Sequence, residues 1–291
     1  TNREFMDDSN IPGQISFSPK HVSTLPNLGE VDIFRSIQYL PGVQLALGST
    51  SDLYIRGGTP DQNLITLDGM TLYQTSHMFG FLSSISKEAI KDVQIFKGHI
   101  PANFGGRTSS VVELMSRSGD NSNYRGSIYG NLMSSGISAE IPIFKKGSVI
   151  FNFRKSRPSN QFSKVYESIE EYMTIDNKFN LITEIGEQNI NQNTEYDLFS
   201  SYEDFFNRFS YLINSKHRAT FTLISSKDSI FEDRGYYGFS NILESDTAYI
   251  EEKHSFKNFG QNINFYSQWN NKYSIQLSIS KYSYENNYFS V

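Results

Sequence analysis

One hairpin constrains the fold of this chain more than any other feature of its sequence. Within residues 63–73, Asp68 and Gly69 lie between two runs of alternating apolar residues. An Asp-Gly pair in this setting is the strongest short-range signal for two strands joined by a two-residue turn. The chain therefore carries at least one tight antiparallel hairpin near its N-terminus.

Short strands and two helical patches surround this hairpin. A helix is expected at about 31–40, where the apolar residues fall on one face before Pro41 and Gly42, and a shorter one at 86–91. Strands with interspersed helices predict a small α+β domain, which we assign to residues 1–120. The strand-like or glycine-rich segments are 52–58, 63–73, 92–98, 103–107 and 110–117.

Beyond Gly119 the pattern changes to alternation of apolar and polar residues. About seven runs show it, each near the ~10-residue length of a strand that crosses a membrane. Short links at 145–147, 214–217 and 270–272 alternate with long links at 157–200 and 226–256, as in outer-membrane barrels. The expected strands lie at about 124–132, 137–143, 149–154, 205–213, 219–223, 262–265 and 273–280.

Seven strands are too few to close around a domain of this size, because small barrels fill their lumen with side chains. An open sheet edge in lipid would also leave backbone groups without partners. The sequence thus predicts a transmembrane antiparallel β-barrel of which residues 121–291 are only the N-terminal strands. The alternative is a soluble all-β adhesion or glycan-binding protein.

The ordered motifs of the first domain resemble the plug of TonB-dependent outer-membrane transporters, in the version typical of the Bacteroidetes. The resemblance covers about 20–120 well and the rest loosely, and its family closes its barrel at about 22 strands. It implies that the α+β domain is a plug in the lumen of the barrel. It also implies active import across the outer membrane of an iron chelate, cobalamin, glycan or peptide. The motifs are Asp52–Gly58, Asn63–Tyr73, Tyr73–Phe81, Ala89–Asp92, Asp92–Gly98, Asn103–Arg107 and Ser110–Arg117.

The resemblance also implies residue roles. Plug arginines in this family pair with barrel glutamates, so Arg56 and Arg107 are expected to form a plug–barrel lock with Glu140; the alternative is solvated arginines in turns. Ligand contacts are expected in the outward plug loops 47–51, 57–63 and 73–79, although packing against the barrel is the other interpretation. The candidate ligand-binding residues are Asp61, Gln62, Tyr73, Gln74, His77 and Met78.

The expected partners are TonB, through a segment upstream of residue 1, together with outer-membrane lipid and lipopolysaccharide. The acidic stretch 157–200, with a short amphipathic helix, could hold a surface lipoprotein or another subunit, or remain a solvated loop. The alternative function is a structural subunit of an outer-membrane complex that keeps the transporter fold without transport.

Several classes of function are not supported. The net charge of −5 disfavours a nucleic-acid partner, and no run of apolar residues reaches the length of a transmembrane helix. There is no cysteine, and the five histidines lack metal-ligand spacing. Neither a phosphate-binding loop nor a nucleophile elbow is present. We therefore expect no enzyme, no cofactor and no metal, and any export signal lies upstream or has been removed.

Overall fold

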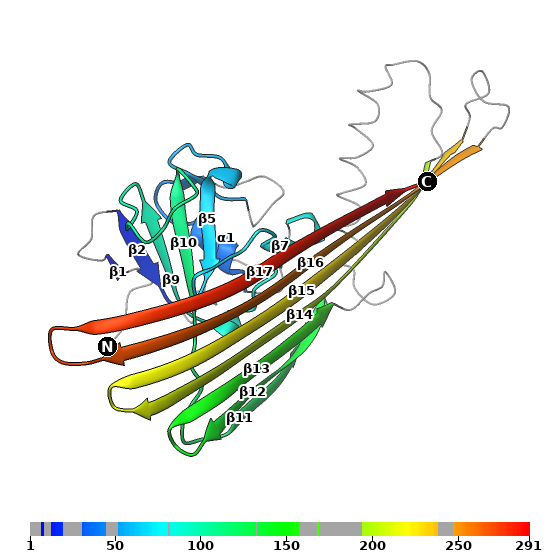
Figure 1. Cartoon of the computed structure of the whole chain (residues 1–291). Helices are drawn as coiled ribbons and strands as arrows, with labels where there is room; N and C mark the ends of the chain where they lie inside the picture. The colour runs from blue at the N-terminus through cyan, green and yellow to red at the C-terminus, as the bar shows by residue number, and fades with distance from the viewer. Residues whose placement is uncertain are drawn as a thin grey trace.

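The computed structural model describes residues 7–8, 13–19, 31–44, 52–80, 82–131, 133–156, 168, 194–237 and 247–291. The described chain forms two bodies of β-structure, an N-terminal domain that contains strands β1 to β10 and a large sheet that contains β11 to β17. In Figure 1 the large sheet is one twisted layer beside the N-terminal domain, and its long strands continue past that domain toward the C-terminus. None of the helices in the described part of the chain is long and apolar enough to cross a membrane.

The N-terminal domain is built on a six-stranded mixed sheet, in which β10 pairs in parallel with β5 and the other neighbours are antiparallel. The sheet order is β1 (Asp7–Asp8), β2 (Gln14–Phe17), β9 (Ile90–Lys97), β10 (Ser110–Ser116), β5 (Asn63–Leu67) and β6 (Met70–Thr71). Two small ladders accompany it, namely β3 (Val43–Gln44) with β4 (Tyr54–Ile55) and β7 (Ser76–His77) with β8 (Leu82–Ser83).

The hairpin that the sequence predicted is confirmed. β5 and β6 are joined at Asp68 and Gly69, whose φ angles of 49° and 84° are both positive. This left-handed pair matches the twist of the flanking strands, and the Asp-Gly sequence tolerates it.

The helical segments are shorter than predicted. α1 covers only Ile33–Gln38, and it begins where the carboxylate of Asp32 accepts a hydrogen bond of 2.9 Å from the main-chain N–H of Arg35. The second expected helix is a 3₁₀ turn, η4 (Lys87–Ala89), because β9 takes over from Ile90. The other 3₁₀ turns are η2 (Pro60–Gln62) and η3 (Met78–Gly80).

The large sheet confirms seven consecutive antiparallel strands. Its three tight links also match the predicted ones, at 144–146, 215–216 and 269–273. The strands are β11 (Arg125–Gly130), β12 (Ser134–Ile143), β13 (Gly147–Ser156), β14 (Thr194–Asn214), β15 (His217–Tyr237), β16 (Thr247–Gln268) and β17 (Ser274–Ser290).

The predicted long link at 226–256 is wrong, because most of it is strand. β14, β15 and β16 are 21, 21 and 22 residues long, about twice the length needed to cross a bilayer. The sequence hides these extensions because both faces are polar there, as in Ser225–Ser229, so no alternation is visible. The predicted amphipathic helix within 157–200 lies outside the described residues.

The two bodies share one hydrophobic core. Ile33, Phe34 and Ile37 of α1 are fully buried against the six-stranded sheet, and the same cluster includes Ile150 of β13, Phe206 of β14 and Ile224 of β15. The opposite face of the large sheet exposes apolar side chains, which include Ile213, Ile263, Ile275, Leu277 and Ile279. The large sheet therefore has one face against the N-terminal domain and an apolar face on its other side.

Candidate functional site

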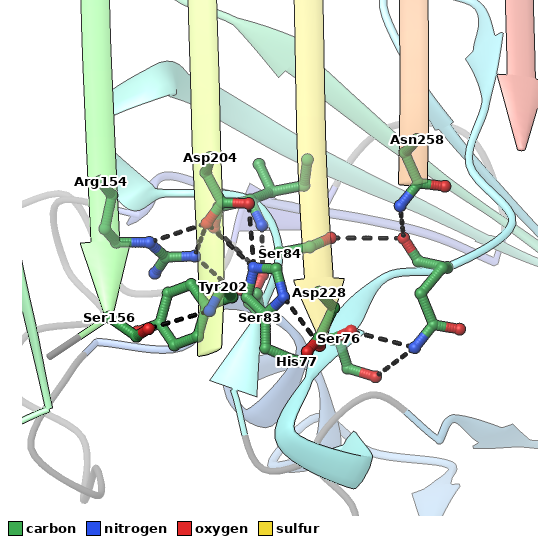
Figure 2. A network of polar contacts seen from close by, with 12 residues as sticks. Ser76, His77, Ser83, Ser84, Arg154, Ser156, Tyr202, Asp204, Asp228 and Asn258 are labelled. Carbon is green, nitrogen blue, oxygen red and sulfur yellow. Dashed lines mark hydrogen bonds and ion pairs between the residues drawn. The ribbon is translucent and has the colours of Figure 1, made fainter. Parts of the chain in front are cut away.

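The most heavily charged contact between the two bodies is a buried cluster around His77, which ends strand β7 (Figure 2). His77 is only 1 % exposed. Its Nε2 lies 2.9 Å from Oδ1 of Asp204 on β14, and its Nδ1 lies 3.2 Å from Oδ2 of Asp228 on β15. One imidazole ring thus connects the N-terminal domain to two neighbouring strands of the large sheet.

Arg154 of β13 completes this arrangement, which we call the His77 cluster (His77, Arg154, Asp204 and Asp228). Its guanidinium donates two hydrogen bonds to Oδ2 of Asp204, of 3.0 and 2.5 Å, and one of 2.6 Å to the carbonyl of Ser83. The N–H of Ser83 donates in turn to Asp32, the residue that caps α1. Side chains from three strands of the sheet therefore contact both strands of the β7–β8 ladder (Figure 2).

The electrostatics of the cluster keep His77 protonated. Burial alone would lower the pKa of His77, but the carboxylates of Asp204 and Asp228 outweigh it and raise the pKa to about 9. Both ring nitrogens then donate, and the ring stacks on Tyr202 with 4.1 Å between centroids. An imidazolium has no lone pair for a metal, and no metal-binding group of side chains occurs among the described residues.

A second polar contact is made by the turn of the first hairpin. The carboxylate of Asp68 accepts hydrogen bonds from Arg208 of β14, at 2.5 Å, and from the hydroxyl of Thr222 of β15, at 2.9 Å. It also accepts from the main-chain N–H of Ser116 at 3.0 Å. We call these four residues the Asp68 cluster.

The two clusters lie on the same pair of strands, β14 and β15. Asp204 and Arg208 lie four residues apart on the same face of β14, and Phe206 lies between them. Phe206 and its neighbour Ile224 belong to the shared hydrophobic core. An apolar contact is thus flanked by a polar cluster on each side, which fixes the position of the N-terminal domain along the sheet.

The predicted lock uses a different arginine. Glu140 is buried and does pair with the N-terminal half of the chain, but its ion-pair partner is Arg117, directly after β10, and it also accepts from the N–H of Asp120 at 3.1 Å. Arg56 and Arg107 are exposed and form no ion pair within the described residues. The pairing of Arg56 or Arg107 with Glu140 is therefore corrected, because Arg117 is the ion-pair partner of Glu140 and the two predicted arginines are exposed.

Three of the predicted ligand-binding residues come together. Asp61, Tyr73 and Gln74 line one open groove of about 370 Å³, and Arg107 lies on the same groove. Gln62 is exposed next to Asp61. The predicted loop 47–51 lies outside the described residues.

His77 and Met78 are corrected. Both are buried, with 1 % and 3 % of their surface exposed, so neither can reach a ligand from this position. The main-chain N–H of Met78 donates to Asp228 at 3.3 Å, and its side chain packs in a small core with Leu82, Met133 and Tyr202. The alternation of the sheet decides this outcome, because it aims Asp204 and Asp228 at the end of β7.

Tyr73 leads to a set of residues that sequence reasoning missed. It is 59 % exposed, and its ring centroid lies 5.6 Å from that of Tyr282 and 6.2 Å from that of Tyr284, both on β17. Phe256 of β16 follows at 6.5 Å from Tyr284. The signal for this group was the spacing of tyrosines at even positions of one strand.

The charged partners in the sheet also escaped prediction, namely Arg154, Asp204, Arg208 and Asp228. Each lies on the inner face of its strand, together with buried apolar side chains such as Phe206 and Ile224. Their isolation between apolar or small neighbours on that face was the available signal.

Comparison with known proteins agrees with this architecture. Residues 16–112 match the family model described as TonB-dependent Receptor Plug Domain. No curated protein matches the sequence.

Solved structures share the fold at low identity. The siderophore receptor PirA from Acinetobacter baumannii is 13 % identical, with a TM-score of 0.51 over 95 % of this chain and 48 % of that one. A variant of the ferric enterobactin receptor PfeA from Pseudomonas aeruginosa is 11 % identical, with a TM-score of 0.53 over 95 % of this chain and 49 % of that one. The copper transporter OprC is 11 % identical, with a TM-score of 0.55 over 97 % of this chain and 47 % of that one. The chain spans about half the length of these structures.

Proposed function

Because this chain carries a TonB-dependent receptor plug, the N-terminal domain, followed by strands of an outer-membrane barrel, we propose that it belongs to a transporter that imports a ligand by energised displacement of the plug. The observation that supports this most directly is the polar seat of the plug. Its docking on the sheet combines one small apolar contact with the His77 and Asp68 clusters.

Such a polar interface suits a domain that must leave the barrel wall and then return to the same position. A wholly apolar interface of the same size would bind without discrimination between registers, whereas buried charges accept only the partner geometry that satisfies them. Breaking one side of a buried pair is costly, so thermal motion alone does not release the plug. An external pull can separate the clusters together, and water in the lumen can then solvate the charges.

In this proposal TonB supplies the pull from the periplasm, and the ligand arrives from outside. The groove lined by Asp61, Tyr73 and Gln74 is the plug surface that meets the ligand. The segment 73–77 links this groove to the His77 cluster within five residues, so a ligand that shifts Tyr73 acts directly on the contact that holds the plug. Occupancy and release are thereby coupled through one bistable segment.

The test is thiol accessibility of a buried plug position in living cells. The chain has no cysteine, so Ser76→Cys places a single reporter in it, at a site that is buried beside His77. In cells growing in rich medium, we expect a membrane-impermeant maleimide to modify this thiol, and a protonophore to suppress the reaction.

The matched control is Thr59→Cys, an exposed position of the same domain. It should react equally with and without the protonophore. If Ser76→Cys also reacts equally under both conditions, the plug does not move in response to the proton gradient, and a scaffold role that keeps the fold without transport takes the place of import.

A further inference from the structure

The inner face of β16 and β17 carries a continuous row of rings, which we call the aromatic strip (Tyr73, His254, Phe256, Tyr282, Tyr284 and Tyr288). From the plug, Tyr73 contacts Tyr282 and Tyr284. The row continues through Phe256 to His254 and ends at Tyr288, whose centroid lies 4.3 Å from that of His254. On β17 the strip runs from Tyr282 to Tyr288 toward the C-terminal end of the strand, which extends past the plug (Figure 1).

Even-numbered residues of these two strands face the plug side. Asn258 and Asn262 are buried there, and Tyr266, Gln276 and Ser278 line a cavity together with Asp68 of the plug. The pairing of β16 with β17 runs without a register shift from Gln268 and Ser274 to Glu252 and Ser290, so the alternation holds along the whole length.

This face is almost free of charge. The even positions of β16 from Glu252 to Gln268 and of β17 hold neither lysine, arginine nor aspartate. Glu252 is the one carboxylate among them, and it accepts a hydrogen bond of 2.8 Å from Tyr288. Besides the rings, the face offers amides and hydroxyls, namely Asn258, Asn262, Asn264, Gln268, Ser274, Gln276, Ser278, Ser280, Asn286 and Ser290.

The charges of the same strands lie on the opposite face, at odd positions. They are Glu251, Lys253, Lys257, Lys281 and Glu285. The segregation is therefore a property of the inner face and not of the strands as a whole, whose ends are rich in charge.

We propose that the aromatic strip binds a neutral oligosaccharide. This inference rests on the proposed function, since it names the class of ligand that the transporter takes. Ring faces carry partial negative charge and stack on the C–H faces of sugar rings, while neighbouring amides and hydroxyls exchange hydrogen bonds with sugar hydroxyls. A strip of successive rings suits a ligand made of successive rings.

The composition of this face disfavours two other classes of ligand, the anionic and the purely apolar. An anionic ligand, such as a catecholate chelate, a uronate or a phosphate, gains from lysine or arginine in its site, and this face provides none while Glu252 repels it. A purely apolar ligand would leave the amides and hydroxyls of the face without partners, which is unfavourable on burial.

The test is ligand binding by the full-length receptor purified in detergent. The probes are neutral oligosaccharides of glucose, mannose, galactose and fructose, with uronate and sulfated oligosaccharides and a ferric catecholate as anionic probes. We expect at least one neutral series to bind and to bind more tightly as the chain lengthens, and none of the anionic probes to compete.

Variants locate the binding on the strip. Tyr284→Ala should weaken binding about tenfold, whereas Tyr284→Phe, which keeps the ring, should stay within about threefold. Ser283→Ala on the opposite face is the matched control and should leave binding unchanged. Heat-modifiable migration of each variant verifies that it is folded, and Tyr288→Ala replaces Tyr284→Ala if the latter is not.

The outcomes separate this inference from the proposed function. Binding of anionic probes alone, absence of binding by every neutral series, or an unchanged affinity of both alanine variants overturns the oligosaccharide assignment even if energised plug movement is observed. If a neutral oligosaccharide binds through Tyr284 but the plug shows no energised movement, the oligosaccharide assignment is supported and the proposed import function is overturned.

Discussion

Two stretches of the same sheet face the plug, and they differ in almost every respect. β13–β15 present Arg154, Asp204, Arg208 and Asp228, all engaged by the plug and all largely buried. β16–β17 present rings, amides and hydroxyls, and Tyr284 and Tyr288 of β17 are exposed. Where β13–β15 meet the plug, their charges are thus paired, whereas the inner face of β16–β17 is nearly uncharged.

This difference divides two tasks between neighbouring strands. Buried charge is expensive to desolvate, and its value lies in rejecting wrong registers more than in net stability. A neutral aromatic surface has a small desolvation cost, and it gains free energy when it stacks on a ring of a ligand. The segment from Tyr73 to His77 touches both surfaces, so the plug spans the boundary between them.

The largest expected effect comes from removing the imidazolium of the His77 cluster. His77→Ala leaves Asp204 and Asp228 buried without their shared partner, and we expect the plug contact to weaken by about 3–5 kcal/mol. Limited proteolysis of the full-length receptor in detergent should then cleave the plug much faster. His99→Ala, an exposed histidine of the same domain, is the control and should behave as the parent does. If the two variants are cleaved at the same rate, β13–β15 do not hold the plug.

A pH titration should reproduce part of this effect without mutation. The pKa of His77 is raised from 6.5 to about 9, so its contribution is complete below pH 6.5 and is lost as the pH rises through 9. The difference corresponds to about 3 kcal/mol.

The measurement is the same proteolysis, followed from pH 6 to pH 9.5 with a protease whose own activity is corrected at each pH. The parent receptor should become more sensitive across this range, and His77→Gln should show a flatter profile. A parent profile as flat as that of the variant would contradict a protonated His77.

The smallest expected effect concerns the arginines of the predicted lock. Arg117→Ala removes the partner of the buried Glu140 and should weaken the contact by about 1–2 kcal/mol. Arg107→Ala and Arg56→Ala should stay within about 0.5 kcal/mol, because both side chains are exposed. Leakage of a large antibiotic through the outer membrane reports all three, and a leakage caused by Arg107→Ala but not by Arg117→Ala would restore the original pairing.

Much of the fold was open to prediction because it rests on local rules. The Asp68–Gly69 turn, the strand at 110–117 and the seven strands with their three tight links follow from turn chemistry and alternation. The lengths of β14–β16 did not follow, since their extensions carry polar residues on both faces and lose the period that marks a strand.

The candidate site divides in the same way. Alternation placed Glu140 on the inner face correctly. Of the predicted outward loop 73–79, Tyr73 is exposed, but Ser76, His77 and Met78 are buried. Tertiary contacts decide whether Arg117 or Arg107 is the partner of Glu140. Tertiary contacts also bury His77, whose partner Asp204 is more than a hundred positions away in the sequence. No local pattern encodes such a distance.

The sequence by itself determined that this chain forms a small mixed domain followed by consecutive antiparallel strands with one polar face. Only the tertiary structure decided which inner side chains meet the plug, because the seating of one body on another fixes the contacts of both. A polar residue on an inner strand face has the same local sequence pattern whether it forms a buried ion pair or faces the open lumen. The docking of the plug on β13–β15 decides which of these environments the residue has.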